Sequence, residues 1–287
     1  MRPGSRRHNS SRRDVAPTKE RPSRALVRRL GGRFSSELGI DVDAGNEEVA
    51  RWFLAASLFG TRIPAGIALR TYRTFADAGI RTAADAGRRT WDDLVALLDR
   101  GGYVRYDFRT ASRLIDLAAT VADRYPEGLA TLSRLEPALL NASLDALPGW
   151  GPVTVRLFLR ELRDVWPGAG PPLDPRALWA AQHLHLRPPK RGRLAWLRRQ
   201  AEGGDVDPRD LEAALVRASL LHGRRHKACP GGGACRLLAP GLWDTLAVPT
   251  SRLVSACGHG LRDAPCVPVQ DQRESPPPEG GKAPRRR

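Results

Sequence analysis

The stretch that decides the fold is Leu147-Pro148-Gly149-Trp150-Gly151-Pro152-Val153-Thr154. We expect a short amphipathic helix before it, from Ser143 to Leu147, and a long helix after it. Its two glycines permit positive φ angles and let the backbone approach another molecule closely. The following helix would then point its free N–H groups and its positive dipole end outward, where they can bind a phosphate. The octet is equally compatible with an ordinary Pro-Gly turn between two helices.

Apolar residues recur at helical spacing over most of residues 46–224. The clearest faces are Val49, Trp52, Phe53 and Ala56; Ala111, Leu114, Ile115, Ala118, Val121, Ala122 and Tyr125; Val155, Phe158, Leu159, Leu162 and Trp166; and Leu211, Ala214, Leu215 and Ala218. Further helices are expected near residues 64–78, 91–100, 174–185 and 192–201. No segment alternates with period 2 and β-branched enrichment, so the sequence predicts an all-α fold.

Length and charge narrow the classes of function. A chain of 287 residues is long enough for one large domain or two modest ones with a sizeable core. The net charge of +16 favours polyanionic partners, nucleic acid before a membrane surface. No apolar run approaches the roughly 20 residues of a membrane helix, and no apolar stretch follows the basic N-terminus. An integral membrane protein and a conventional secretory signal are therefore not expected.

The charge is concentrated at the N-terminus. Residues 1–34 hold eleven Lys and Arg against two acidic residues and show no periodicity, which predicts a disordered basic leader. Such a leader either acts as an arm on phosphates or is simply solvated. We expect a helical domain over residues 35–238, with the hairpin at 143–155. Scattered Pro, Gly and charge predict a poorly ordered tail over residues 239–287.

A loop rich in Gly and Pro, residues 167–173, follows the long helix and leads into Asp174-Pro175-Arg176 at the start of the next helix. Together, the hairpin and this loop resemble the corresponding motifs of the helix-hairpin-helix (HhH-GPD) DNA glycosylase superfamily, in particular those of its endonuclease III-like branch. The resemblance covers about residues 46–224. It implies two helical lobes with a cleft between them. One lobe would span about residues 58–165, and the other would combine the helix at 46–59 with those after Asp174.

The resemblance also implies a function in base excision repair. The matching aspartate of the family is its catalytic carboxylate, so Asp174 would assist the attacking nucleophile or stabilise the positive charge on the deoxyribose. The simpler interpretation is that Asp174 caps its helix, with Pro175 at the first helical position, and the two roles are compatible. The expected protein is a monomer that binds double-stranded DNA in the cytoplasm, at the nucleoid, and not at a membrane.

Candidate DNA contacts lie in the hairpin and in one other loop. The predicted set is Leu147, Pro148, Gly149, Trp150, Gly151, Pro152, Val153 and Thr154, together with Tyr103, Arg105 and Tyr106. An aromatic ring between two glycines is expected to be exposed, so Trp150 could stack on a base or contact the backbone. The resemblance further implies that hairpin carbonyls hold a monovalent cation. Phe59 could wedge into the base stack or belong to the core, and we favour the core.

One departure from the family concerns the nucleophile. Bifunctional members carry a lysine in the hairpin, which forms a Schiff base with the sugar and leads to strand cleavage. Val153 stands at that position here. A Schiff-base lyase is therefore not expected, and Asp174 would act with water as in a monofunctional DNA N-glycosylase.

The cysteines are a second departure. Relatives of endonuclease III bind a [4Fe–4S] cluster through four closely spaced cysteines after the final helix. Cys229 and Cys235 follow at about that place, but Cys257 and Cys266 come much later, in an unusual C-x5-C-x21-C-x8-C spacing. We expect no cofactor and free thiols. A cluster, or zinc held by His226, Cys229, Cys235 and one distant ligand, is the less favoured alternative.

Two other functions remain open at this point. A relative that binds distorted DNA through its hairpin and basic leader, without catalysis, is consistent with the same departures. An all-helical protein-binding scaffold explains the charge less well. The substrate base cannot be read from the sequence, because pocket residues lie on scattered loops.

Overall fold

The computed structural model describes residues 21–59, 63–222 and 229–238. These residues contain twelve α-helices and no β-strand, which confirms the predicted all-α class. The helices are α1 (Pro22–Leu30), α2 (Phe34–Glu37), α3 (Asn46–Ser57), α4 (Ala65–Asp77), α5 (Ala83–Gly87), α6 (Trp91–Gly101), α7 (Asp107–Arg124), α8 (Pro137–Asp145), α9 (Pro152–Glu161), α10 (Pro175–His183), α11 (Arg193–Glu202) and α12 (Pro208–His222). Short 3-10 turns lie at Val42–Ala44, Leu129–Arg134 and Gly232–Ala234. None of the described helices combines the length and the apolar character that a membrane span requires.

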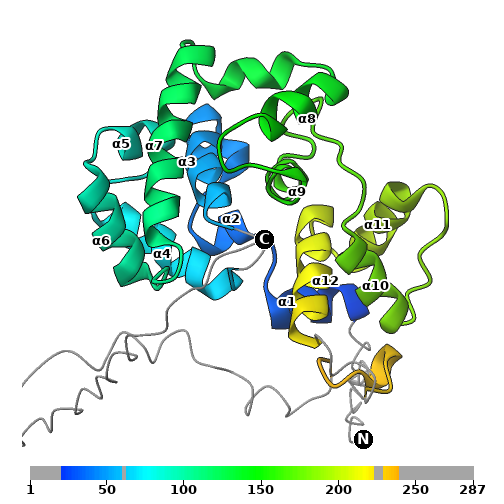
Figure 1. Ribbon diagram of the computed structural model, residues 1–287. Coiled ribbons are helices and arrows are strands. Elements are labelled where there is room, and N and C mark those ends of the chain that lie inside the picture. The colour runs from blue at the N-terminus through cyan, green and yellow to red at the C-terminus, as the bar shows by residue number, and fades with distance from the viewer. Residues whose placement is uncertain (1–20, 60–62, 223–228, 239–287) are drawn as a thin grey trace, which may run out of the picture. The chain divides into compact units, whose positions relative to one another are not determined.

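Helices α2 to α9 pack around one continuous core, which we call the first helical set (Figure 1). Its centre is α3, whose predicted apolar face is buried as expected. Leu54 and Ala55, on the opposite side of α3, are buried as well, so the helix is enclosed by protein all round. It contacts α4, α5 and α9. The sequence prediction grouped this helix with the helices after Asp174. That grouping was wrong, because α3 carries buried apolar residues on all sides and packs against α4, α5 and α9.

Local capping signals fix several ends of the first helical set. The Thr90 hydroxyl accepts a hydrogen bond from the Asp93 N–H at 3.1 Å, while the Asp93 carboxylate accepts one from the Thr90 N–H at 3.4 Å. This reciprocal pair starts α6, the helix that the sequence predicted near residues 91–100. The helix ends at Gly102, which adopts the left-handed conformation with φ 98° that glycine favours.

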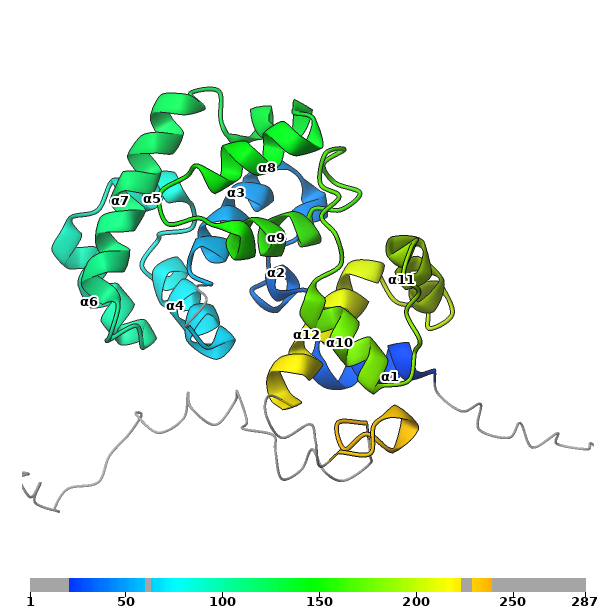
Figure 2. The ribbon, with the colours of Figure 1, turned by 45° about the vertical axis from the view of Figure 1, so that its right-hand side comes forward.

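Helices α1, α10, α11 and α12 form a second helical set, in which α12 contacts each of the other three (Figures 1 and 2). The presence of α1 corrects the prediction of disorder over residues 1–34. Leu26 and Leu30 lie four residues apart on α1 and are buried, and α12 packs against this helix. The partner surface that makes this short helix stable comes from residues far along the chain, so local sequence does not reveal it. Residues 1–20 lie outside the described ranges.

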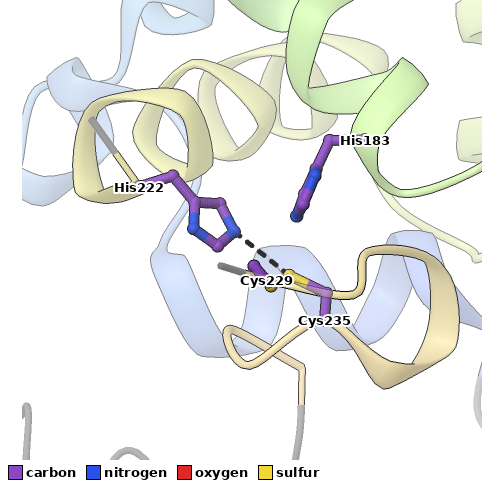
Figure 3. A group of neighbouring side chains, drawn as sticks. All are labelled: His183, His222, Cys229 and Cys235. Carbon is purple, nitrogen blue, oxygen red and sulfur yellow. Dashed lines mark hydrogen bonds between the residues drawn. The ribbon is translucent and has the colours of Figure 1, made fainter. Parts of the chain in front are cut away.

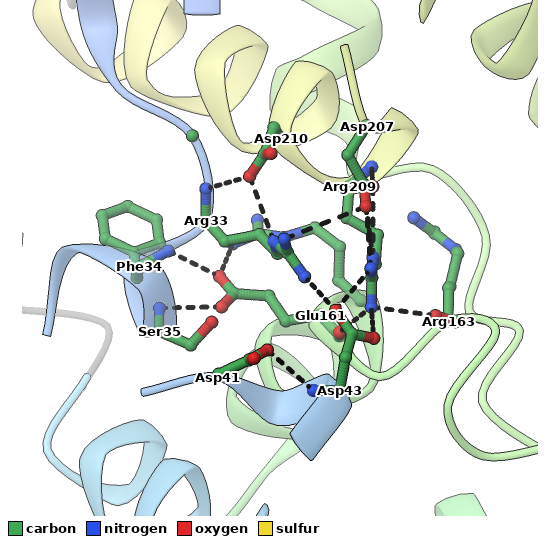
Figure 4. Close-up of polar contacts among 12 residues, drawn as sticks. Arg33, Phe34, Ser35, Asp41, Asp43, Glu161, Arg163, Asp207, Arg209 and Asp210 are labelled. Atoms are coloured by element: carbon green, nitrogen blue, oxygen red, sulfur yellow. Dashed lines mark hydrogen bonds and ion pairs between the residues drawn. The ribbon is translucent and has the colours of Figure 1, made fainter. Parts of the chain in front are cut away.

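A network of charged side chains, with Glu161 and Arg209 buried and Asp43 exposed, joins the two sets (Figure 4). Glu161, at the end of α9, accepts hydrogen bonds from the first two backbone N–H groups of α2, each at 2.9 Å. Arg209 of α12 pairs with Asp43 at 2.8 Å and with Asp207 at 2.7 Å, and it also donates to the Arg163 carbonyl at 3.3 Å. The Arg209 guanidinium holds the pKa of the Asp43 carboxyl below its usual value. These contacts fix the start of α12 against the end of α9.

By their contacts, all of the described residues belong to one compact unit. The predicted tail over residues 239–287 lies outside the described part of the chain.

Candidate functional site

The hairpin connects α8 to α9 and presents the start of α9. Gly149 has a φ of 78°, which an L side chain rarely adopts, so this glycine is required by the turn. Gly151 has φ −165° and ψ 177°, an extended conformation open to any residue, so of the two glycines only Gly149 uses the positive φ that glycine permits. Pro152 opens α9, and its first intrahelical hydrogen bond runs from the Val155 N–H to the Gly151 carbonyl at 3.0 Å. The N–H groups of Val153 and Thr154, which precede this bond, have no partner within the helix, so they can bind an external group.

Trp150 is an internal anchor of the hairpin and not the exposed aromatic that the sequence predicted. Its ring is 8% exposed and stacks on Phe53 with centroids 4.5 Å apart. Its indole N–H donates to the Ser57 hydroxyl at 3.0 Å. Burial removes a large apolar ring from water and still satisfies its one polar group, so the core site is the more stable one. The hairpin is therefore held down on α3 by Trp150.

Tyr103 is likewise buried, which corrects its assignment as a stacking residue. It is 4% exposed, and its hydroxyl donates to the Leu58 carbonyl. Burial raises the pKa of the Tyr103 hydroxyl. The neighbouring Tyr106 is partly exposed, and the exposed Arg105 guanidinium lies 5.8 Å from the centroid of its ring. Arg105 and Tyr106 thus keep side-chain surface that could contact another molecule.

The other hairpin residues divide between the surface and the core. Pro152, Val153 and Gly149 are exposed, and Pro148 is partly so. The side chains of Leu147 and Thr154 are buried, so Leu147 can contact DNA only through its main-chain groups. The Thr154 side chain instead lines a cavity. That cavity, of about 390 Å³, lies beside the hairpin and is also lined by Tyr106, Arg109, Arg113, Pro148 and Gly149.

Asp174 begins α10 as the predicted N-cap. Its Oδ1 accepts a hydrogen bond from the Arg176 N–H at 2.8 Å, and Pro175 follows at the first helical position. The residue is 9% exposed, yet it lines a second cavity of about 500 Å³. Val153 of the hairpin, which stands where the bifunctional glycosylases carry a lysine, lines the same cavity.

The remaining cavity wall comes from five other elements or turns. It includes residues of α1, α2, α4 and α12 and Phe59 just after α3. Phe59 is 8% exposed and packs with Phe34 at a centroid distance of 5.1 Å, which confirms the expected core position. Most of the residues that line this cavity are apolar. Its charged residues are three arginines, Arg160, Arg176 and Arg217, and one carboxylate, Asp174.

Buried charges hold the Asp174 segment in place, a feature that the sequence did not reveal. Glu212 of α12 is fully buried and accepts a hydrogen bond from the Asp174 N–H at 2.9 Å. Its other oxygen pairs with the buried Arg163 guanidinium, which also donates to the Pro171 carbonyl at 2.7 Å. One carboxylate therefore fixes both the Gly/Pro-rich loop and the start of α10. No local pattern marks a glutamate on the buried face of α12 for this purpose.

A second group of chemically active side chains lies at the far end of α10. The sulfur atoms of Cys229 and Cys235 are 3.8 Å apart, and both thiols are free. His183 and His222 complete the group (Figure 3). Burial raises the pKa of the Cys235 thiol to about 11. Sequence reasoning named the cysteines but missed both histidines.

This group does not fit the [4Fe–4S] cluster that the family resemblance implies. Its donors are two thiols and two imidazoles, whereas such a cluster takes four thiolates. All four ligand atoms lie within 4.8 Å of one another. A multi-iron cluster places several metal and sulfide atoms between its ligands and so holds them further apart. His226, Cys257 and Cys266 lie outside the described residues.

The spacing His222-x6-Cys229-x5-Cys235, which begins at the end of the last long helix, is a signal that could have found His222. No comparable signal marks His183, which lies on another helix.

In comparisons with known proteins, no family model matches the chain, and no curated protein is significantly similar to its sequence.

Proposed function

We propose that this protein binds double-stranded DNA and removes a damaged or mispaired base as a monofunctional DNA N-glycosylase. The observation that carries the proposal is the cavity of about 500 Å³ that Asp174 shares with Val153 of the hairpin. Its volume is within the usual range for sites that enclose a small ligand. An extruded base and its sugar would enter here, between the start of α9 and the start of α10.

In this proposal the hairpin positions the DNA backbone. The first N–H groups of α9 and the positive end of its dipole would bind one phosphate, a contact that is independent of sequence. The Leu147 carbonyl accepts the Trp150 N–H at 3.0 Å and keeps a second lone pair, with which it could also bind a monovalent cation. Trp150 supports the hairpin from below and is not itself a DNA contact.

Asp174 would be the catalytic carboxylate. As the base departs, positive charge develops on the deoxyribose, and a carboxylate that lines the cavity can stabilise it or accept a proton from attacking water. Oδ1 is oriented by the Arg176 N–H, and Glu212 fixes the backbone at Asp174. Val153 offers no amine, so the nucleophile would be water.

The surrounding charge suits a polyanion. Arg160, Arg176 and Arg217 line the cavity, and the chain as a whole carries +16. Such a field raises the local concentration of DNA and steers its approach. Basic residues of the N-terminal segment would add affinity that depends on salt and not on sequence.

The alternative is a non-catalytic protein that binds distorted DNA. It is favoured by the capping hydrogen bond of Asp174, which by itself explains an aspartate at the start of α10. In that case the carboxylate charge would have no chemical role.

A panel of duplexes tests the proposal. The full chain is incubated with duplexes that carry uracil, oxidised, alkylated or mismatched bases, and alkali then reveals abasic sites as strand breaks. We expect excision from at least one duplex, and a fall of roughly 10²–10⁴-fold in Asp174→Asn with unchanged DNA affinity. Asp41→Asn is the matched control, because Asp41 caps the Asp43 N–H at 3.1 Å and does not line the cavity.

The opposite results are equally informative. Excision that survives in Asp174→Asn refutes the catalytic role. Salt-dependent DNA binding without excision on any duplex supports the binding protein instead. Reduction with borohydride should trap no covalent adduct with DNA, because Val153 and not a lysine follows the hairpin glycines at that position. A strong adduct would reveal another amine as the nucleophile.

A further inference from the structure

Four side chains from three segments converge at the end of the second helical set that is remote from Asp174 (Figure 3). His183 ends α10, His222 ends α12, and Cys229 and Cys235 flank the 3-10 turn Gly232–Ala234. Their ligand atoms all lie within 4.8 Å of one another. His222 Nε2 is 3.2 Å from Cys235 Sγ. Imidazole nitrogen and thiolate sulfur are the ligands that zinc takes in structural sites.

We propose that His183, His222, Cys229 and Cys235 bind a single zinc ion in a closed, tetrahedral site. Two sulfurs bound to one zinc at about 2.3 Å lie about 3.8 Å apart at the tetrahedral angle, and a sulfur and a nitrogen lie about 3.5 Å apart. The separation of 3.8 Å between Cys229 and Cys235 matches the first value. The separation of 3.2 Å between His222 and Cys235 is close to the second.

The donor set selects the metal and the role. Two sulfurs and two nitrogens in a tetrahedron suit zinc, whereas calcium and magnesium require oxygen ligands. Four protein ligands leave no open position for water or substrate, so the ion would be structural and not catalytic. With two thiolates and two neutral imidazoles the site carries no net charge. A fully buried Cys235 and a buried His222 can therefore hold it without an unpaired ion.

Neighbouring groups already orient the ligands. The Arg236 N–H donates to Cys229 Sγ at 3.4 Å, a contact that favours the thiolate. The His183 ring is stacked on Trp179, with centroids 5.4 Å apart and an interplanar angle of 4°. The His183 and His222 rings meet edge to face, with centroids 4.6 Å apart. Both imidazoles are thus held at a fixed angle to each other before any ion binds.

The backbone of the cysteine segment is shaped for this close approach. Gly231 has φ 74°, and a Cβ there would lie 2.4 Å from the His183 carbonyl oxygen. Gly232 has φ 53°, and a Cβ there would lie 2.5 Å from His185 Nδ1. Only glycine at these two positions allows Cys229 and Cys235 to reach the end of α10.

The consequence of zinc binding is mechanical. Zinc would displace two thiol protons into solvent and tie residues 229–238 to the ends of α10 and α12. These two helices also carry Asp174 and Glu212, so the ion would stabilise the helical pair that presents the cavity. The inference does not depend on the proposed glycosylase activity, because an ion at this site would tie the same segments together whatever the cavity at Asp174 binds.

The test measures metal directly on the full chain, expressed with zinc in the medium and purified without chelator. Elemental analysis should give one zinc per chain, with neither stoichiometric iron nor acid-labile sulfide. Cobalt exchanged into the site should give the intense visible bands of a tetrahedral ion and the near-ultraviolet thiolate charge-transfer band. Cys235→Ser and His183→Ala should lose the zinc, whereas Cys257→Ser and Cys266→Ser should keep it.

Three results would overturn the inference: a wild-type chain without zinc and without the cobalt spectrum, iron and sulfide in cluster stoichiometry, or zinc lost only when Cys257 or Cys266 is replaced. If Cys235→Ser fails to fold, the cobalt spectrum and X-ray absorption of the wild-type chain still decide. The latter should show two sulfur and two nitrogen neighbours around zinc, and any other set of donors refutes the site.

Discussion

The sharpest test of the architecture is the removal of one buried charge, in Glu212→Gln. Glu212 is fully buried and pairs with Arg163, which is 3% exposed, while its other oxygen accepts the Asp174 N–H at 2.9 Å. Glutamine keeps the shape of the side chain and the carbonyl that Asp174 needs. It removes the charge that compensates Arg163, so the substitution isolates the ion pair from the loop hydrogen bond.

The expected loss is large because Arg163 cannot reach solvent. Breaking a buried pair from one side typically costs about 3–5 kcal/mol, most of it from the charge that is left without compensation. At about 2–4 °C per kcal/mol for a domain of this size, Tm should fall by roughly 6–20 °C. Glu212→Ala should lose more than Glu212→Gln, because alanine also removes the acceptor for the Asp174 N–H and leaves a cavity.

The assay is urea unfolding, followed by far-ultraviolet circular dichroism. The slope m of the unfolding free energy against urea concentration checks that unfolding remains a two-state transition in each variant. The control is Asp164→Asn. Asp164 pairs with Arg198 at 2.9 Å, but the two side chains are 66% and 47% exposed, so its loss should cost about 0–1 kcal/mol. Asparagine also tolerates the positive φ of 65° at this position. If Glu212→Gln is no more destabilising than this control at the same m, the role assigned to the buried pair is wrong.

Two further predictions concern the hairpin and the N-terminus. Gly149→Ala should destabilise the fold by about 1–2 kcal/mol, because φ is 78° there and the Arg113 side chain lies 3.3 Å from the new Cβ. Gly151→Ala should be as stable as the wild type, because Gly151 is extended and no atom lies near its added Cβ. A loss of affinity for all DNA sequences alike in Gly151→Ala therefore reports the phosphate contact alone. Unchanged DNA affinity in both variants would contradict that contact. Deletion of residues 1–20 should flatten the salt dependence of DNA binding without loss of stability. A deletion that also removes α1 should lower the free energy of unfolding by several kcal/mol, because it removes two buried leucines and exposes the surface of α12 that they cover. Equal stability of the two truncated chains would refute the role of α1, and an unaltered salt slope in the shorter deletion would mean that residues 1–20 do not touch DNA.

The sequence by itself determined the all-α class and most of the longer helices. Helical periodicity, N-caps and prolines at first helical positions act over three or four residues, so their effect is visible locally. Thr90 and Asp93 start α6 in this way, and Asp174 with Pro175 starts α10. The turn at Gly149 follows the same logic, since a positive φ is a local demand on one residue. The resemblance to a glycosylase superfamily rests on these local features and stays a prediction.

Only the tertiary structure decided which side chains are buried, which helices are stable and which polar groups meet. Trp150 and Tyr103 looked like exposed aromatics in loops, but each found a core site with a hydrogen-bond partner. Helix α1 has too few residues to be stable alone and depends on α12. The meeting of His183 with His222, Cys229 and Cys235, and the support of Asp174 by Glu212, join residues that are distant in sequence. No rule of spacing links such distant residues, because their meeting depends on how whole helices pack. That packing is set by the complementarity of surfaces that no short window of sequence contains.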